Sequence, residues 1–436
     1  MPSRTSWVIG VLALALTIRA AVAIKLQDQL DHRWQREFLI EGDAAGYWTL
    51  AEQIANGNSY EIYSPPRRVL RMPGFPALLA LNMGLIGSGM LGIRLSLCLI
   101  GTIAVGLVYW LGYELSSHTT GLIASLLAAL SPVMAGFTPL ILSETLFAAC
   151  LLGSLITMAR LVREAESRTW RAWAAAIATG GMIALACYVR PSWLLAAPLF
   201  ALVLVILSSN RLRAAGLGAV VVLTLIAALL PWALRNQRVT GHFVLTTLWV
   251  GPSLYDGLNP EAGGGSDMTF FERDNLMNSM SEYDVDREYR RRAWLFVKEN
   301  PVRTLQLAAI KFWRFWSPVP NAAQFDDSLA RLAVAGFFIP TVLLALLGGH
   351  FVVRRGTTDP RTINDRPSNW PRREVAWFLL LTAGPIVYFT ALHLVFVSSL
   401  RYRLPAEYPL LILTAVGLQV GWRWWRGRRS SVQVAA

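Results

Sequence analysis

Residues 7–24 read WVIGVLALALTIRAAVAI, an apolar run close to the roughly 20 residues that a helix needs to cross a bilayer. Nine more runs of this kind follow, at 91–113, 121–137, 143–162, 172–188, 192–209, 214–234, 328–352, 374–397 and 403–422. Only 15% of the 436 residues are charged, whereas soluble domains carry about 25%. The sequence therefore predicts an all-α polytopic membrane protein with about ten transmembrane helices, built as a single membrane domain over 1–436.

Two further apolar stretches have less certain roles. Residues 73–87 are short and interrupted by prolines, and residues 302–316 carry Lys311 and Arg314 among aromatic side chains. A helix that mixes cations and aromatics in this way lies in the membrane interface more readily than it crosses the membrane. We expect interfacial helices in the outer loops of the protein.

Arginines gather in the loops on one side of the predicted membrane domain. Two of these loops contain Arg160, Arg163, Arg168, Arg171, Arg211 and Arg213, and a third is basic between 354 and 373. Because positive loops stay in the cytoplasm, we expect a multi-pass protein of the cell inner (plasma) membrane with both termini cytoplasmic. The basic tail 423–436 lies on the same side. This distribution explains the net charge of +13 without nucleic acid as a partner.

The first apolar run permits a second interpretation. Ala21-Val22-Ala23 near its end matches a signal-peptide cleavage site, although Arg19 interrupts the apolar region. The orientation of the rest of the chain is the same in both cases. Two large loops then face outward, at 25–90 and at 236–327, and the second is expected to form a small subdomain or lid.

Arginines at the outer ends of the predicted helices need another explanation. Each has a proline nearby, which restricts the local backbone, and the set comprises Arg71, Arg190, Arg235, Arg401 and Arg403. Guanidinium groups form paired hydrogen bonds with phosphate oxygens. The set therefore indicates a phosphate or diphosphate bound at headgroup level, while the alternative is contact with ordinary lipid headgroups.

Two acids accompany these arginines on the outer side. Asp43 stands at the head of a predicted short helix in GDAAGYWTLAEQI (42–54), and Glu144 begins a predicted span in LSETLF. Alternative roles are a helix N-cap for Asp43 and a favourable helix-dipole position for Glu144. Tyr47, Leu50 and Ile54 follow Asp43 at helical spacing, so we expect this stripe to face the membrane domain. Acids, arginines and aromatics in one outer pocket favour sugar transfer from a lipid phosphate.

Other motifs point to no metal and no cofactor. The triplet DVD (284–286) matches the DxD of metal-dependent sugar transfer, but it lies in the charged run EYDVDREYRRR, which predicts a solvated helix face. The three cysteines all fall inside apolar runs and have no metal-ligand spacing.

The order of these motifs is similar to that of a known family. GDAAGYWTLAEQI, RMPGFPALLAL, SETLF, PWALRN with GHFV, and RYRLPAEYPLLIL resemble bacterial GT-C glycosyltransferases of the family 39 type, relatives of protein O-mannosyltransferases and of lipid A aminoarabinose transferases. The resemblance covers nearly the whole chain. This sequence differs from the eukaryotic members at Asp43, which is flanked by Gly42 and Ala44 where those members have paired acids. We also expect no large C-terminal outer domain.

The resemblance implies a set of roles. Asp43 matches the catalytic acid, Glu144 matches a second functional acid, and the donor is a sugar on a polyprenyl phosphate whose phosphate contacts the RMPGFP and RYRLP arginines. We expect a single inverting displacement onto a hydroxyl of a lipid, glycan or protein acceptor, with Tyr47 and the outer arginines binding substrate. The alternatives are a lipid-linked-sugar flippase, which would place functional charges near the bilayer midplane, and a non-catalytic scaffold.

Overall fold

The computed structural model describes residues 3–320, 328–355 and 372–434. Within these ranges the chain is helical, and the only strand-like pairing is one isolated bridge between Ile62 and Arg67. The helices are α1 (Arg4–Asp28), α2 (Glu41–Ala55), α3 (Gly74–Ile86), α4 (Met90–Leu115), α5 (His118–Leu130), α6 (Pro132–Phe137), α7 (Glu144–Glu164), α8 (Trp170–Val189), α9 (Ala196–Leu207), α10 (Arg211–Thr240), α11 (Val250–Gly257), α12 (Thr269–Asp274), α13 (Glu282–Glu299), α14 (Pro301–Phe315), α15 (Ser328–Arg355), α16 (Arg372–Thr382), α17 (Gly384–Val395) and α18 (Leu400–Val434). The predicted all-α class is confirmed.

Seven helices in the described ranges are long and apolar enough to cross a membrane: α1, α4, α7, α8, α10, α15 and α18. The bent pair α16 and α17, which meet at 54°, makes an eighth if it counts as one span. The predicted count of about ten is therefore approximate. Of the other predicted spans, 121–137 is divided at Ser131, because Pro132 cannot continue a preceding helix. The apolar helix at 191–207 is likewise short.

The two stretches with uncertain roles form α3 and α14, of 13 and 15 residues. At 1.5 Å per residue, each reaches only about 20 Å, less than the hydrocarbon thickness of about 30 Å. Helix α14 buries Leu307 and Phe315 and exposes Leu305 and Trp313. This two-sided pattern fits the predicted interfacial helix.

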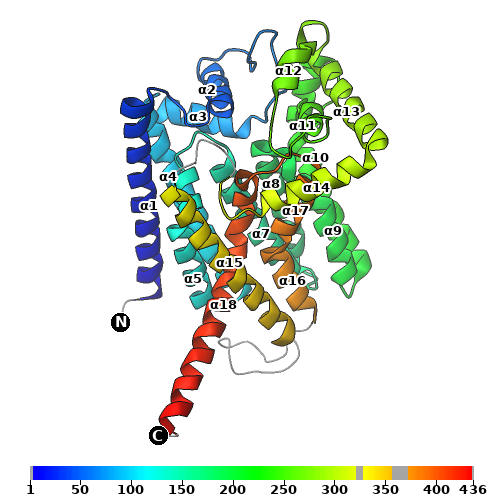
Figure 1. The fold of residues 1–436 in the computed structure, drawn as a ribbon. Coiled ribbons are helices and arrows are strands. Elements are labelled where there is room, and N and C mark those ends of the chain that lie inside the picture. The colour runs from blue at the N-terminus through cyan, green and yellow to red at the C-terminus, as the bar shows by residue number, and fades with distance from the viewer. Residues whose placement is uncertain (1–2, 321–327, 356–371, 435–436) are drawn as a thin grey trace.

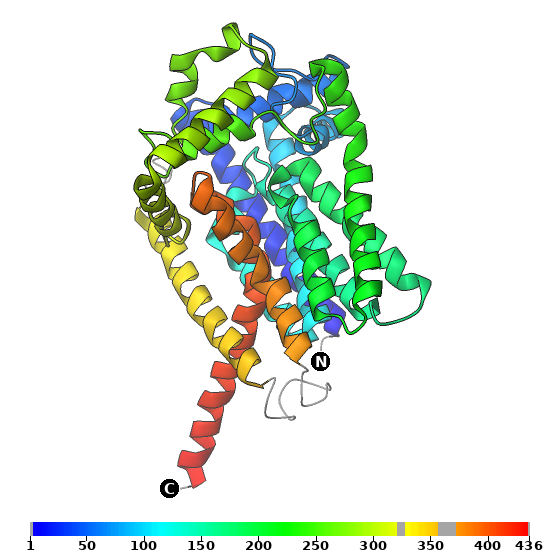
Figure 2. The same cartoon turned by 90° about the vertical axis from the view of Figure 1, so that its right-hand side faces the viewer.

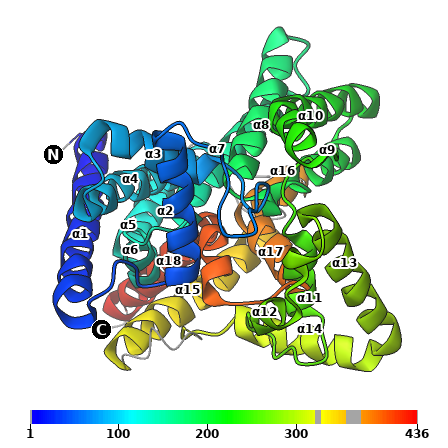
Figure 3. The ribbon, with the colours of Figure 1, turned by 90° about the horizontal axis from the view of Figure 1, so that it is seen from above.

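The spans pack side by side, with α7 and α18 as the most deeply buried. Small residues permit the close approaches, as between α4 and α5, where a Cβ on Gly112 would lie 2.8 Å from the Cα of Gly121. Helices α2, α3 and α11–α13 gather at one end of this bundle, and both ends of the chain lie toward the other end (Figures 1 and 2). Seen from above, α2 lies across the bundle near α18 and the α11–α14 group occupies a separate corner (Figure 3). The bundle is thus covered at one end by the two predicted outer loops.

Parts of three predicted segments lie outside the described residues. These are 321–327 of the second outer loop, 356–371 of the third basic loop, and 435–436 of the tail. The described part of the tail continues α18 as a helix that projects from the bundle (Figure 2).

Candidate functional site

Five charged side chains form an unbroken series of ion pairs at the covered end of the bundle. Arg71 donates to Oδ1 of Asp43 over 2.7 Å, and Arg401 donates to Oδ2 of the same carboxylate over 2.5 Å. Arg401 also pairs with Oε1 of Glu144, which accepts a second hydrogen bond from Arg190 over 2.6 Å. The order is therefore Arg71, Asp43, Arg401, Glu144, Arg190. Three arginines against two acids leave this series with a net charge of +1.

The five residues come from five separate parts of the chain. Asp43 lies in the first turn of α2, while Glu144 is the first residue of α7 and Arg401 the second of α18. Arg71 precedes α3, and Arg190 directly follows α8. The predicted short helix at Asp43 is thus present. Its N-cap position is occupied by Ile40 rather than Asp43, so the carboxylate is available for the arginines.

Glycine in the RMPGFP motif permits a close contact between the start of α3 and the end of α8. A Cβ on Gly74 would lie 2.7 Å from the carbonyl oxygen of Tyr188, near the end of α8. Only a residue without a side chain allows the start of α3 to lie this close to that backbone. Arg71 and Arg190 are therefore held on the two sides of one close contact between α3 and α8.

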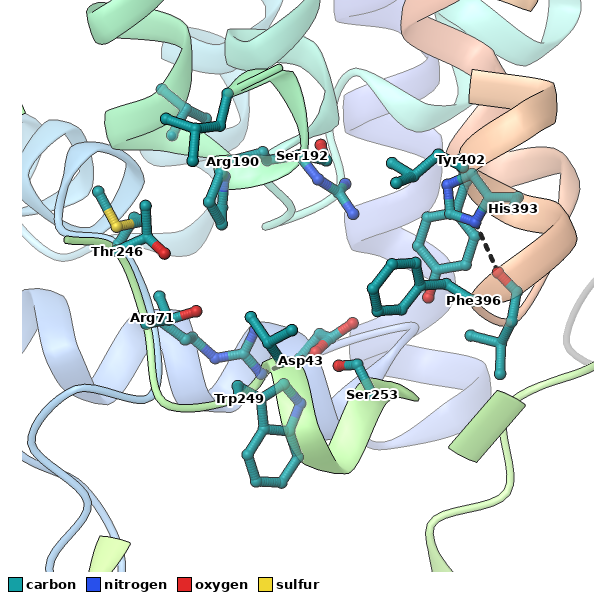
Figure 4. Close-up of a pocket in the computed structure, with 18 of the residues that line it drawn as sticks. Asp43, Arg71, Arg190, Ser192, Thr246, Trp249, Ser253, His393, Phe396 and Tyr402 are labelled. Carbon is teal, nitrogen blue, oxygen red and sulfur yellow. Dashed lines mark hydrogen bonds and ion pairs between the residues drawn. The ribbon is translucent and has the colours of Figure 1, made fainter. Parts of the chain in front are cut away.

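A cavity of about 410 Å³ opens beside the series of ion pairs. Its lining includes Asp43, Arg71 and Arg190, which are labelled in Figure 4, together with Arg401. Aromatic residues line it as well, and they comprise Tyr47, Trp249, Tyr388, Phe396 and Tyr402. A cationic patch next to aromatic walls can hold an anionic group together with the apolar face of a larger ligand.

The second outer loop contributes one wall of this cavity. Thr246, Trp249 and Ser253 come from this loop and from α11, which belongs to it. The loop is joined to the first outer loop by Glu282, whose carboxylate accepts hydrogen bonds from the backbone N–H groups of Arg68 and Val69 over 2.8 and 3.1 Å. The second outer loop thus forms one wall of the cavity and is held to the first outer loop.

The electrostatics of Asp43 follow from its two partners. Burial alone would raise the pKa of its carboxyl, but Arg401 and Arg71 outweigh this effect and hold the pKa well below its ordinary value. Asp43 in turn raises the pKa of Arg71, although burial acts in the opposite direction. The pair is therefore fully ionised at neutral pH, and Asp43 is a weak base while both arginines contact it.

Glu144 lies behind the cavity and does not line it. Its side chain is only 1% exposed, and both Arg190 and Arg401 pair with Oε1. Its other oxygen, Oε2, is buried without a hydrogen-bond partner in the described part of the chain. Glu144 therefore orients the two arginines that face the cavity.

Tyr47 faces the same cavity one helical turn after Asp43. Its hydroxyl lies 3.1 Å from that of Ser143, and the guanidinium of Arg71 lies over its ring at 4.4 Å. Leu50 is buried as predicted, but Ile54 is 37% exposed, so the predicted stripe ends before it. The structure thus places Tyr47 as a support for Arg71.

The structure places Arg235 and Arg403 outside the cavity lining. Arg235 donates to the backbone carbonyls of Arg68 and Tyr60. Arg403 is fully buried, pairs with Glu407, and donates to the carbonyls of Phe315 and Ser317 over 2.6 and 2.9 Å. Both arginines bind protein backbone and neither lines the cavity, so the structure gives no support to the prediction that they contact substrate.

Several lining residues were not predicted from the sequence. Tyr402 stands between two predicted arginines in RYRLP, so its position was a usable signal. His393, Trp249 and Ser253 carry no motif, and only the packing of α17 and α11 brings them to the cavity. The triplet DVD also has another role, because Asp286 accepts from the N–H of Gly251 and pairs with Arg290. Within the described ranges, no three His, Cys, Asp or Glu side chains are grouped as metal ligands.

Comparisons with known proteins place the fold. Residues 70–232 match the family model described as dolichyl-phosphate-mannose-protein mannosyltransferase. The oligosaccharyltransferase AglB from Archaeoglobus fulgidus, in complex with an inhibitory peptide and a dolichol-phosphate, matches with a TM-score of 0.56 and 13% identity, over 98% of this chain and 52% of that one. An Archaeoglobus fulgidus oligosaccharyltransferase in the apo form matches with a TM-score of 0.57 and 14% identity, over 98% of this chain and 52% of that one.

A further match is ArnT from Cupriavidus metallidurans in the apo state, with a TM-score of 0.46 and 14% identity, over 95% of this chain and 77% of that one. No curated protein matches this sequence. The chain spans about half the length of the archaeal oligosaccharyltransferase. The resemblance to GT-C glycosyltransferases is confirmed by the family-model match, and the archaeal structures share this chain's fold.

Proposed function

From the GT-C fold and the mannosyltransferase-family match at 70–232, we propose that this chain transfers a sugar from a polyprenyl-phosphate donor to a hydroxyl acceptor at the outer face of the cell inner membrane. The observation that carries the proposal is the cavity where Arg71, Arg190 and Arg401 converge beside Asp43. The archaeal match in complex with a dolichol-phosphate supports a lipid phosphate as the group that these arginines receive. Both termini then lie in the cytoplasm, because the site is at the opposite end of the bundle.

The chemistry is a single displacement at the anomeric carbon. The acceptor oxygen bonds to this carbon from the side opposite the phosphate, while the bond from carbon to phosphate oxygen breaks and its electron pair leaves with the polyprenyl phosphate. The configuration at the carbon is inverted. Asp43 receives the proton of the acceptor hydroxyl, and assistance of this kind contributes about 10²–10⁴-fold in rate.

Donor binding resolves the weakness of Asp43 as a base. The donor phosphate competes for the guanidinium groups of Arg71 and Arg401, which donate to Asp43 in the structure. As their charge is shared with the phosphate, the pKa of Asp43 rises toward its ordinary value. The base thus gains strength only when the donor is in place.

The remaining groups act on the phosphate through the arginines. Arg190 and Arg401, held by Glu144, and Arg71, supported by Tyr47, meet the charge that develops on the leaving phosphate. Groups fixed before the reaction stabilise such charge without reorganisation. Glu144 is in this scheme a positioning residue and Asp43 the catalytic one.

The experiment compares wild-type protein with Asp43→Asn in purified membranes. Both receive a panel of radiolabelled polyprenyl-phosphate sugars, and donor loss and labelled product are followed. We expect donor consumption in the wild type and a loss of about 10²-fold or more in Asp43→Asn. The matched control is Glu41→Gln, because Glu41 lies in the same first turn of α2 and is exposed to solvent.

Three other outcomes would contradict the proposed base or support a different function. Near wild-type transfer by Asp43→Asn contradicts the proposed base. Labelled lipid that crosses the bilayer unchanged in both proteins supports the flippase instead. Donor that binds without turnover in both proteins supports a scaffold.

A further inference from the structure

We propose that His393 is a specificity-determining residue that accepts a hydrogen bond from a hydroxyl group of the transferred sugar, in an inference that rests on the proposed function. His393 lies near the end of α17 and lines the cavity, although only 8% of the residue is exposed (Figure 4). It is the one histidine among the cavity-lining residues. The mechanism proposed above, which relies on the arginines, Asp43 and Glu144, assigns no role to His393.

The hydrogen bonding of the ring defines what it offers. Nδ1 of His393 lies 2.6 Å from the carbonyl oxygen of Val397. A carbonyl oxygen only accepts, so Nδ1 carries the hydrogen. In the neutral imidazole the other nitrogen, Nε2, is then an acceptor. Within the described residues Nε2 has no hydrogen-bond partner, and the residue lines the cavity.

Aromatic stacking fixes the orientation of this ring. The ring of Tyr402 stacks on it with centroids 4.7 Å apart and planes 8° apart, and Phe315 stacks at 5.8 Å and 22°. Together with the hydrogen bond to Val397, these contacts fix both the orientation of the ring and its tautomer. A fixed acceptor discriminates between ligands better than a mobile one, because no ordering entropy is lost on binding.

The position of the ring relative to the arginines suits a sugar. The guanidinium groups of Arg190 and Arg401 lie 5.5 and 5.8 Å from the centroid of the Tyr402 ring on which His393 stacks. Because Arg190, Arg401 and His393 line the same cavity, a ligand whose phosphate contacts the arginines can extend its next group toward His393. In the donor, the group attached to the phosphate is the sugar.

The surrounding wall has the character of a carbohydrate site. Phe396 offers a flat apolar surface to the cavity (Figure 4), and Ser253 adds a hydroxyl group to the lining. A sugar ring has apolar C–H faces and hydroxyl groups at its rim, and it satisfies both kinds of surface at once. Burying an acceptor such as Nε2 opposite a ligand without the matching hydroxyl leaves that acceptor unpaired, which is unfavourable.

The test measures lipid binding, so it needs no knowledge of the acceptor. Purified protein in nanodiscs binds tritiated polyprenyl phosphate, which is displaced by polyprenyl phosphates carrying mannose, glucose, galactose or xylose, and then by mono-deoxy analogues of the tightest one. The variants are His393→Phe, which keeps the ring but has no acceptor, and His393→Gln, whose amide oxygen can accept. The matched control is His242→Phe, since His242 stacks on Tyr283 in the second outer loop and does not line the cavity.

We expect the tightest sugar lipid to lose roughly 3- to 10-fold in affinity in His393→Phe. His393→Gln recovers part of this loss. One mono-deoxy analogue binds wild type and His393→Phe alike, because the hydroxyl that Nε2 recognises is absent from it. Bare polyprenyl phosphate binds wild type, His393→Phe and His242→Phe equally.

Two results overturn the inference while the proposed function stands. One is an equal loss of affinity in His393→Phe for all lipids, bare polyprenyl phosphate included, which shows a structural role. The other is that His393→Phe binds every sugar lipid with the same affinity as wild type. Failure of the wild type to bind the tritiated polyprenyl phosphate overturns the proposed function itself, and this inference with it.

Discussion

Arg401 donates a hydrogen bond to Oδ2 of Asp43 across 358 positions of the chain, at 2.5 Å. The contact joins the short outer helix α2 to the start of α18, the last span in sequence. Because Arg401 also pairs with the buried Glu144 of α7, one guanidinium holds three helices together at the site. If the proposed function holds, stability and donor binding depend on the same side chain.

Arg401→Ala removes the shared partner of two carboxylates. Breaking a buried ion pair on one side costs about 3–5 kcal/mol, because the remaining charge is left buried and uncompensated. We expect a lower thermal unfolding temperature in detergent for Arg401→Ala, and a partial recovery when Glu144→Gln is added, since the neutral amide no longer needs Arg401. Equal unfolding temperatures for Arg401→Ala and wild type contradict this account.

The pH dependence of transfer is expected to differ between kcat/KM and kcat. Asp43 must be ionised to act as a base, so activity falls as the pH drops through its pKa. In the free enzyme Arg401 and Arg71 hold that pKa well below its ordinary value despite burial, and kcat/KM, which reports the free enzyme, should show no acid limb from Asp43 down to about pH 4.

In the donor complex the phosphate competes for these arginines. The pKa of Asp43 then rises, and the acid limb of kcat should appear at a higher pH than any limb of kcat/KM. The measurement is a pair of pH profiles of donor consumption in wild type and in Glu41→Gln. A kcat limb at or below that of kcat/KM argues against the exchange of partners between Asp43 and the phosphate.

Arg403 is expected to act on stability and not on donor affinity. It is fully buried, and its guanidinium lies 3.7 Å from the centroid of the Phe338 ring while donating to the backbone at the end of α14. Arg403→Ala leaves those carbonyls without a donor and should lower the unfolding temperature. Folded Arg403→Ala should still bind polyprenyl phosphate as wild type does.

Arg190→Ala is the comparison, because Arg190 lines the cavity. Loss of one charged hydrogen bond costs about 1.5–3 kcal/mol, so polyprenyl phosphate should bind roughly 10- to 100-fold more weakly. If Arg403→Ala folds normally but loses as much affinity as Arg190→Ala, the sequence-based prediction that Arg403 contacts the substrate is supported.

The contrast between these arginines shows how far the sequence leads. Apolar periodicity and positive loops indicate at which end of a helix a residue lies, so Arg71, Arg190 and Arg401 were correctly predicted to share one level with Asp43. Arg235 and Arg403 fit the same pattern. Whether such a side chain faces a cavity or a neighbouring backbone depends on which helices pack beside it, and this is a tertiary property.

Glu144 and His393 show the same limit from two directions. The sequence pattern shows that Glu144 begins a span, but it does not show that the side chain lies behind the arginines. A lone histidine in an apolar helix has no spacing that marks it, and His393 gains its role only when α17 packs beside Tyr402 and Phe315. The helices were predictable from local pattern, whereas that pattern did not separate the arginines that line the cavity from those that bind backbone and did not mark His393.

Gly74→Ala tests the close contact that brings the RMPGFP and VRPSW motifs together. The added Cβ would lie 2.7 Å from the carbonyl oxygen of Tyr188, a backbone atom that cannot rotate away. Overpacking of this kind typically costs about 1–3 kcal/mol. We expect a lower unfolding temperature and weaker binding of polyprenyl phosphate, because α3 must move away from α8 and Arg71 moves with it.

The control lies in the same helix. A Cβ on Gly84 would meet no heavy atom of the described residues within 4 Å, and alanine in place of glycine within a helix stabilises by about 0.5–1 kcal/mol. Gly84→Ala should therefore keep or slightly raise the unfolding temperature and bind polyprenyl phosphate as wild type does. Equal behaviour of the two variants would show that the approach of α3 to α8 does not set the distance between Arg71 and Arg190.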